Sequence, residues 1–565
     1  MQSAFGAAQA DYEPMIQSAT RSEYGDYQAN FAMRLAKILQ KKPMEIAQTV
    51  IDHLSHRETF RLLDPSGPGF INITLSDEFL AQQLQKLIGD DRLGVEKAHK
   101  PETIVVEYSS PNVAKEMHVG HLRTTIIGDA FARIFDFLGH KVIRQSHIGD
   151  WGTQFGMIIE YLLETNQANI KHSISELNLL YKKSKQRFDE DPAFADKARA
   201  RVVALQGGDK ATLAIWQNLV NESENYFATV YEKLNVLLKH DDIRGESFYN
   251  DTLANITNDL EKRHIAEISD GALVIFLEGF VDPDNKPVPM IIRKKDGGYL
   301  YATTDLAAAK YRIETLKGNR IIYITDARQK QHFAMLFAAV DKAGWMTATA
   351  KLEHVPYGAV LGEDNRPFKT RSGETISLIS LLDEAEERAA TLATAKNPEL
   401  SKDQIKTIAK AIGVGALKYA DLRADKVKDY VFSWDKMLSF DGNTAPYLQN
   451  AYVRTRSIFR TGKIDLNSLK TEKIIIAEPV EHLLAVKLLE FSDIVPSIAH
   501  DLGLHRLCEY LYDVAATFHK FYEHCPILSA PDQASRNSRL LLCDITARTL
   551  KLGLSLLGIE VVEQM

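Results

Sequence analysis

Residues 110–121, with the sequence SPNVAKEMHVGH, decide the fold of the centre of the chain. Just before them, the nearly all-apolar run 103–108 (TIVVEY) predicts a buried parallel strand. Just after them, apolar spacing predicts a helix over 118–138, and residues 141–145 (KVIRQ) predict a second strand. A strand, a glycine-bearing turn, a helix and a strand form a βαβ unit, which indicates a parallel α/β sheet.

Two histidines stand where the predicted helix starts. Ligands of parallel sheets bind at the carboxyl ends of the strands, where helix N-termini point. His118 and His121 are three residues apart and share one face of the first turn. Gly120 leaves room for a ligand, and the free N–H groups of a helix N-terminus favour phosphate. Two imidazoles at this point could bind phosphate oxygens and stabilise the charge that develops on them.

Two other interpretations of the histidine pair stay open on spacing alone. An isolated H-x-G-H is more often a pair of ordinary surface or capping histidines. The H-x-x-H spacing also suits zinc, but no third ligand stands at a zinc-like spacing and there is no H-E-x-x-H. The strand before, the helix after and Lys115 three residues upstream favour the phosphate interpretation.

Composition narrows the class of protein. The chain has 565 residues, enough for about three domains, with 45% hydrophobic and 25% charged residues, which excludes a disordered or disulfide-stapled chain. A net charge of −7 argues against a bulk nucleic-acid coat. The three cysteines form no C-x-x-C pair, and we expect no signal peptide and no membrane span. We therefore expect a cytoplasmic protein.

Pattern changes divide the chain into three parts. Residues 1–100 mix helices with short strands, including a strand over 70–75 and a helix over 77–88, and predict a small α+β domain. Residues 101–400 form the α/β part, with a charged helical insertion at about 165–250. From about 405 to 565 helical periodicity dominates. Further strands of the α/β part are expected at 273–276, 290–293, 320–324 and 352–357.

The segment 110–121 resembles the signature of class I aminoacyl-tRNA synthetases, in the form found in arginyl-tRNA synthetases. The resemblance covers nearly the whole chain, and its matching segments are 106–156, 234–249, 299–310, 367–383, 445–457 and 552–565. It implies a Rossmann-like catalytic domain, an N-terminal domain that contacts the outer corner of tRNA, and an all-α anticodon-binding domain.

The resemblance departs from the class pattern at the second signature, K-M-S-K-S. This chain has Phe-Lys-Thr-Arg-Ser-Gly at 368–373, which keeps one lysine, Lys369. In arginyl enzymes the lysine upstream of H-x-G-H is thought to stand in for the missing one, and Lys115 holds that place. Alone, Lys369 could equally be a solvated loop lysine.

The family resemblance assigns roles residue by residue. The residues expected in catalysis are Lys115, His118, His121 and Lys369. The residues expected to bind ATP are His118, Gly120, His121, Lys369 and Arg371. The residues expected to bind arginine are Glu107, Asn112, Tyr301, Asp305 and Gln329. Taken singly, the last three could be a core tyrosine, a helix N-cap and a surface glutamine. Asp150, in the turn 147–152 (HIGDWG), is given no catalytic role.

A basic stretch from Tyr447 to Lys473 holds six basic and two acidic residues, with tyrosines between them. Such a helix face is more often simply solvated. The resemblance makes it part of the anticodon-binding domain, with Tyr447, Arg454 and Arg456 as tRNA-binding residues.

The implied function is that of a monomeric arginyl-tRNA synthetase, with no protein nucleophile. ATP, accompanied by Mg²⁺, would activate L-arginine, and the arginyl group would pass to the 2′-hydroxyl of the terminal ribose of tRNA(Arg). The resemblance also implies that activation requires tRNA. Two rivals are a small-molecule adenylyltransferase and an RNA-binding paralogue with a dead site. The helical tail argues against the first, and the intact lysines and histidines argue against the second.

Overall fold

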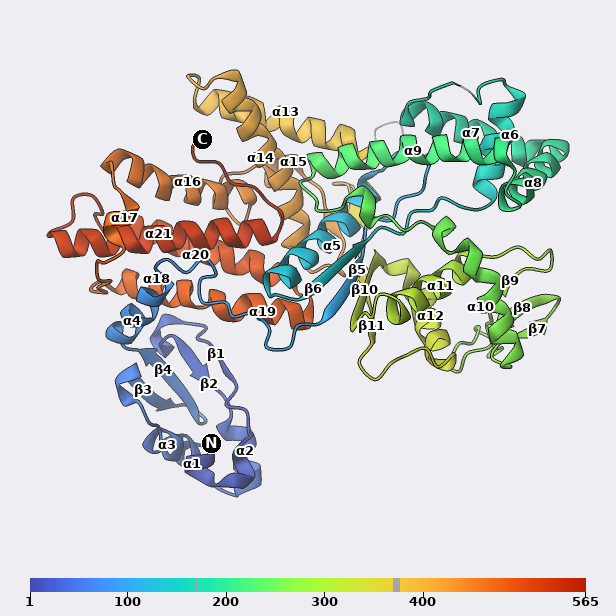
Figure 1. Cartoon of the computed structure of the whole chain (residues 1–565). Coiled ribbons are helices and arrows are strands. Elements are labelled where there is room, and N and C mark those ends of the chain that lie inside the picture. The colour runs from blue at the N-terminus through green and yellow to red at the C-terminus, as the bar shows by residue number, and fades with distance from the viewer. Residues whose placement is uncertain (169, 369–375) are drawn as a thin grey trace.

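The computed structural model describes residues 1–168, 170–368 and 376–565, and a four-stranded parallel sheet lies at its centre (Figure 1). The strand order is β11-β10-β5-β6. The strands are β5 (Thr103–Glu107), β6 (Lys141–Gln145), β10 (Arg320–Asp326) and β11 (Lys351–Tyr357). Helix α5 (Val119–Phe137) connects β5 to β6, which confirms the predicted βαβ unit. Because β5 lies between β10 and β6, its carboxyl end faces the switch point where such sheets bind ligands.

The expected strands at 273–276 and 290–293 do not join this sheet. They form β8 (Ala272–Ile275) and β9 (Met290–Arg293), which pair antiparallel with each other and with β7 (Glu267–Ser269). Both strands are present where the sequence predicts them, but they belong to a separate antiparallel sheet. No helix separates β8 from β9, and neighbouring parallel strands need a long crossover. Helices α10 (Asn250–Lys262), α11 (Tyr301–Glu314) and α12 (Lys330–Lys342) lie in the same part of the chain.

The N-terminal part is an antiparallel sheet of order β1-β2-β4-β3 with helices packed on it. Its elements are β1 (Ile16–Ser18), β2 (Tyr27–Ala29), α2 (Ala32–Leu39), α3 (Pro43–Asp52), β3 (Phe60–Ser66) and β4 (Phe70–Leu75). A short α1 (Gln2–Phe5) precedes them, and α4 (Asp77–Leu87) follows. Leu35, Ile46 and Ile71 are buried between the helices and the sheet. The α+β prediction is confirmed here, including the strand at 70–75.

Two helical regions flank the central sheet (Figure 1). After α6 (Thr153–Glu164), the helical insertion consists of α7 (Ile174–Glu190), α8 (Pro192–Gln206) and α9 (Lys210–Lys233). The C-terminal region contains α13 (Leu378–Lys396), α14 (Lys402–Leu422), α15 (Trp434–Met437), α16 (Ala445–Gly462), α17 (Leu466–Leu469), α18 (Pro479–Leu489), α19 (Phe491–Asp501), α20 (Leu504–His524) and α21 (Gln533–Leu556). Within the described ranges, no helix is both long and apolar enough to cross a membrane.

Polar contacts, one set of them buried, join the end of α9 to the C-terminal region. Lys418 of α14 is fully buried, and its ammonium donates to the carbonyls of Leu234 and Gly558 at 2.7 Å each. Lys233, the last residue of α9, pairs with Asp383 of α13 at 2.7 Å. The end of the helical insertion is therefore fastened to both α13 and α14.

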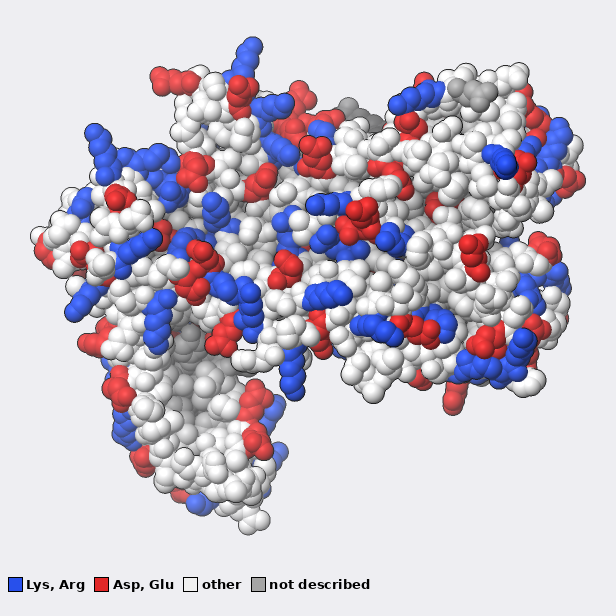
Figure 2. All heavy atoms as spheres, viewed as in Figure 1, with Lys and Arg blue, Asp and Glu red and all other residues white. Residues whose placement is uncertain are grey.

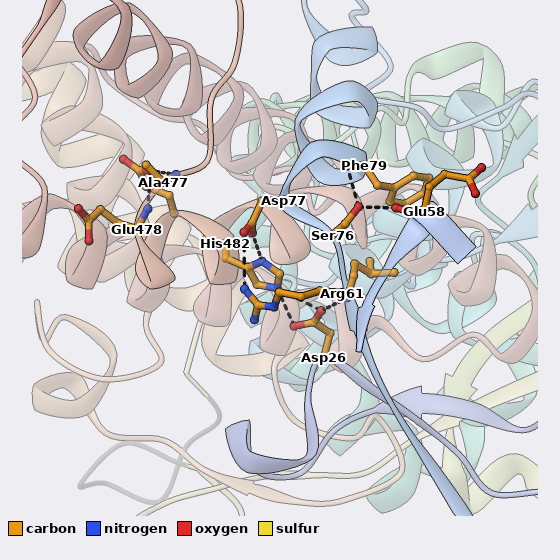
Figure 3. Close-up of polar contacts among 11 residues, drawn as sticks. Asp26, Glu58, Arg61, Ser76, Asp77, Phe79, Ala477, Glu478 and His482 are labelled. Atoms are coloured by element: carbon orange, nitrogen blue, oxygen red, sulfur yellow. Dashed lines mark hydrogen bonds and ion pairs between the residues drawn. The ribbon is translucent and has the colours of Figure 1, made fainter. Parts of the chain in front are cut away.

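A buried histidine of α18, His482, contacts two carboxylates of the N-terminal part (Figure 3). Nδ1 of His482 lies 2.6 Å from Asp77, and Nε2 lies 3.0 Å from Asp26. Burial alone would lower the pKa of His482, but the hydrogen bonds and charges of the two carboxylates outweigh it and raise the pKa. Arg61 lies 3.5 Å from Asp77 and supplies a second cation. His482, Asp26, Asp77 and Arg61 thus form a cluster of charged side chains at the junction of the two parts, here called the clasp.

Candidate active site

The HxGH loop (residues 110–121) lies at the carboxyl end of β5 and enters α5, with His118 as the N-cap residue. Nδ1 of His118 accepts a hydrogen bond from the N–H of Gly120, and Nδ1 of His121 accepts one from the N–H of His118, both at 3.0 Å. Each ring must therefore carry its proton on Nε2. The rings lie side by side, with centroids 4.0 Å apart. The pair therefore offers two Nε2–H donors.

Both histidines are held in the neutral form. Burial, and then the charge of Lys115, lowers the pKa of His118. Burial, followed by the neighbouring His118, lowers the pKa of His121 to about 3. At neutral pH neither ring is an imidazolium, so both act as hydrogen-bond donors without a net charge of their own.

The helical insertion holds the HxGH loop in place. The N–H of Ala114, a residue at φ +59°, donates to Ser223 Oγ at 2.9 Å, and the N–H of Met117 donates to the hydroxyl of Tyr226 at 3.2 Å. Ser223 and Tyr226 lie on α9. Two residues of α7, Ser175 and Tyr181, also contact the loop, at Glu116 and Lys115. The loop's backbone is thus tied to residues more than one hundred positions away in the sequence.

Asp305 lies in the first turns of α11 and faces two histidines. Its Oδ2 lies 2.6 Å from Nε2 of His332 on α12, and its Oδ1 lies 3.6 Å from Nε2 of His147. Tyr301, one turn before Asp305, is 62% exposed, and its ring lies 5.1 Å from the His332 ring. The structure therefore brings Tyr301 and Asp305 together, and it adds two histidines that the sequence analysis missed.

Glu107, the last residue of β5, is buried in an ion pair with Arg312 of α11. Arg312 is fully buried and also donates from Nε to Gln145 at 2.7 Å. A guanidinium of the protein itself therefore already neutralises the Glu107 carboxylate on one oxygen. No sequence signal marked Arg312, since it lies in an alanine-rich helix without a charge pattern.

Asn112 and Gln329 are exposed at the carboxyl edge of the sheet. Asn112 pairs with Gly149 in an isolated parallel bridge, and a Cβ on Gly149 would lie 2.2 Å from the Asn112 side-chain oxygen. The glycine therefore makes room for this amide. Gln329 precedes α12 directly, after the end of β10.

Asp150 and Glu246 are two neighbouring carboxyl groups, and Glu246 also lies near Asp305. Asp150 accepts hydrogen bonds from the backbone N–H of Ser247 at 2.8 Å and from its hydroxyl at 2.5 Å, which is an architectural role. In the sequence, Glu246 stands out only as part of the matching segment 234–249. Burial, followed by the charges of Asp150 and Asp305, raises its pKa to about 8. A second carboxyl group therefore lies near Asp305.

Lys369 and Arg371 lie outside the described residues. Within the ranges that the structure describes, no group of three or more His, Cys, Asp or Glu residues could hold a metal ion.

Arg454, Arg456 and Arg460 of the basic stretch lie on α16, whereas Lys463, Lys470 and Lys473 follow its end. Figure 2 shows Lys and Arg side chains over this part of the C-terminal region. Tyr447 is partly buried against Tyr512 and His519, with the ring of His519 5.0 Å away. Arg454 donates to Nδ1 of His519 at 3.0 Å. Arg456 pairs at 3.0 Å with Glu563 in the C-terminal tail, so its charge is partly used within the chain.

Comparisons with known proteins agree with this arrangement. Residues 83–434 match the model of the catalytic domain of class I tRNA synthetases of the arginine (R) type. Residues 1–75 match the arginyl-tRNA synthetase N-terminal domain, and residues 448–565 match the DALR anticodon-binding domain. The sheet, its HxGH loop and the helical C-terminal region are thus those of a class I aminoacyl-tRNA synthetase.

Relatives that match over nearly the whole chain indicate which amino acid this class I synthetase family uses. The chain is 49% identical to the arginine–tRNA ligases of Klebsiella pneumoniae (strain 342) and Escherichia coli (strain K12 / DH10B), over 99% of this chain and 97% of each relative. The crystal structure of arginyl-tRNA synthetase from Plasmodium falciparum matches with a TM-score of 0.84 at 32% identity, over 100% of this chain and 97% of that one. The chain belongs to the arginyl-tRNA synthetases.

Proposed function

We propose that the site at the carboxyl end of β5 activates L-arginine with ATP and transfers it to the 3′-terminal ribose of tRNA(Arg), releasing AMP and diphosphate. The observation that carries this proposal is the pair of neutral imidazoles, His118 and His121, at the N-terminus of α5 with Lys115 just upstream. A helix N-terminus with neutral donors and one ammonium suits a polyphosphate that gains charge during reaction.

In the activation step the carboxylate of arginine attacks the α-phosphorus of ATP and diphosphate leaves. The Nε2–H groups of His118 and His121 donate to phosphate oxygens, and Lys115 supplies positive charge. Gly120 leaves space beside the rings, because a Cβ there would lie 2.8 Å from the His118 ring. Lys369 and Arg371 complete the phosphate site in this proposal. Mg²⁺ is expected to arrive on the phosphates, and no step is assigned to a metal held by protein side chains.

The guanidinium of the substrate lies against Asp305 in this proposal, with the hydroxyl of Tyr301 beside it. Guanidinium has five donors in a plane, and a carboxylate meets it best. Glu107 and Asn112 flank the end of β5 and, with Gln329, hold the α-amino end and the side chain. Oε1 of Glu107 takes this role, since Arg312 pairs with Oε2 and Oε1 has a long contact, at 3.5 Å, from the hydroxyl of Ser110.

For the tRNA, we propose that Tyr447 stacks on an anticodon base and that Arg454 and Arg456 contact the phosphates. The N-terminal domain would contact the outer corner of the tRNA. We propose that the enzyme acts as a monomer. We also propose that it acts in the cytoplasm, where a reducing environment suits its three free cysteines.

Charging of total tRNA with each of the twenty amino acids tests the proposal. We expect ATP-dependent charging with arginine alone. Charging with another amino acid would overturn it. Arginine-dependent ATP–pyrophosphate exchange without any charging would point to an adenylyltransferase, and tRNA binding without either reaction would point to an RNA-binding protein.

A further inference from the structure

Lys115 makes a contact that the activation chemistry does not account for. Its ammonium nitrogen lies 4.2 Å from the ring centroid of Tyr181, on α7 of the helical insertion. The neighbouring Glu116 accepts a hydrogen bond from Ser175, also on α7, at 2.5 Å. Two consecutive residues of the HxGH loop are therefore held by the same helix.

A lysine side chain has four rotatable bonds before its ammonium, and fixing it in one place costs conformational entropy. An aromatic ring fixes an ammonium by electrostatic attraction to its face. Unlike a carboxylate, the neutral ring does not cancel the positive charge. N–H groups that point away from the ring remain free for oxygen acceptors.

We propose that Tyr181 is a positioning residue for Lys115 in adenylate formation. This inference rests on the phosphate role of Lys115 in the proposed function. The ring holds the ammonium at the edge of the HxGH loop before ATP binds. The conformational entropy of the Lys115 side chain is therefore lost before, and not during, the binding of the phosphates.

The electrostatics of the loop agree with this placement. After burial, the charge of Lys115 is the next cause that lowers the pKa of His118, and it also contributes at His121. The positive charge of Lys115 therefore acts on both rings of the HxGH loop. Tyr181 is only partly buried, so its substitution can be tested without emptying a core.

The experiment measures kcat/KM for ATP in arginine- and tRNA-dependent ATP–pyrophosphate exchange. The variants are Tyr181→Leu, Tyr181→Phe, Lys115→Ala and the double variant Tyr181→Leu/Lys115→Ala. Phe188→Leu is the matched control, because Phe188 also lies on α7 and its ring is 5.7 Å from the ammonium of Lys185, away from the HxGH loop. Thermal unfolding of each variant reports on the fold.

We expect Tyr181→Leu to lower kcat/KM by roughly 3- to 10-fold, the size of a partly desolvated cation–π contact. Tyr181→Phe keeps the ring face and should retain wild-type activity. In the Lys115→Ala enzyme, Tyr181→Leu should have no further effect, since the group it positions is gone. Phe188→Leu should be as active as the wild type.

Three results would overturn the inference. They are wild-type activity in Tyr181→Leu, an equal loss in Tyr181→Phe, and an equal further loss when Tyr181→Leu is added to Lys115→Ala, which a purely structural role would give. A Lys115→Ala enzyme with wild-type exchange would instead refute the proposed role of Lys115 itself. The two failures are therefore distinguishable.

Discussion

Nε2 of His332 lies 2.6 Å from the carboxylate of Asp305, and the two residues come from different helices, α12 and α11. The histidine fixes the direction of one carboxylate oxygen, and the other faces His147 at 3.6 Å. A carboxylate oriented in this way can meet a planar cation in a defined geometry.

The first prediction is that Asp305→Asn weakens arginine use specifically. The amide keeps the shape of the side chain but loses the charge, which should cost on the order of 2–4 kcal/mol in a desolvated site. The loss should appear as a higher KM for arginine or a lower kcat/KM, measured at saturating ATP and tRNA. Glu314→Gln, on the exposed end of the same helix, is the control and should behave as the wild type. Unchanged arginine dependence in Asp305→Asn would remove this residue from the pocket.

The second prediction concerns the ionisation of the HxGH loop. His121→Ala should slow adenylate formation by roughly 10²-fold or more while the Kd for tRNA stays the same. Because the pKa of His121 is about 3, the slowing factor should be the same at pH 6 and at pH 8. His500→Ala, on an exposed face of α19, should have no effect. A slowing factor that changes between the two pH values would show that His121 titrates in this range.

The third prediction concerns coupling between tRNA and activation. Arginine-dependent exchange should be negligible without tRNA and appear when tRNA(Arg) is added, since a ligand that prefers the competent state shifts the population toward it. Tyr447→Ala should raise the tRNA concentration required, whereas Tyr447→Phe, which keeps the stacking ring, should not. Strong exchange in a preparation shown to contain no tRNA would contradict the coupling.

The fourth prediction concerns the clasp at His482. Its pKa is raised above the usual 6.5, so the charged clasp contributes fully below pH 6.5 and is lost as the pH rises through the raised value. His482→Asn should therefore speed hydrogen exchange of the amides in α4 and β4 at pH 6, after correction for intrinsic rates. The difference from the wild type should shrink as the pH rises.

The control for this clasp is His56→Asn, in which an exposed histidine of the same domain is replaced. It should leave exchange in α4 and β4 unchanged at every pH. A difference between His482→Asn and the wild type that stays constant with pH would show that the contact is steric rather than ionic.

Local patterns predicted the elements around the HxGH loop because β5, α5 and β6 are neighbours in the sequence. The pairing of β8 with β9 could not be predicted in this way, since an apolar run does not specify its partner. In the site, too, local sequence patterns could not predict contacts between residues that are far apart in the chain. The family resemblance assigns Asp305 and Tyr301 to the site, and they lie one turn apart on one helix. The contacts of Arg312 with Glu107 and of Tyr181 with Lys115 depend on the folded chain bringing distant residues together.

Helix α9 contacts the HxGH loop at Tyr226 and the C-terminal region at Lys233, seven residues apart, or about 10 Å along the axis at 1.5 Å per residue. A continuous helix of this length transmits displacement as a stiff rod rather than absorbing it as a loop would. A shift of α13 and α14 when an anticodon stem docks on the C-terminal region would therefore reach the backbone of Met117 within two helical turns. Helix α9 is thus a rigid connection between the two sites. Substitution of Tyr226 or Lys233 should weaken the coupling between tRNA binding and arginine activation, while each substrate still binds.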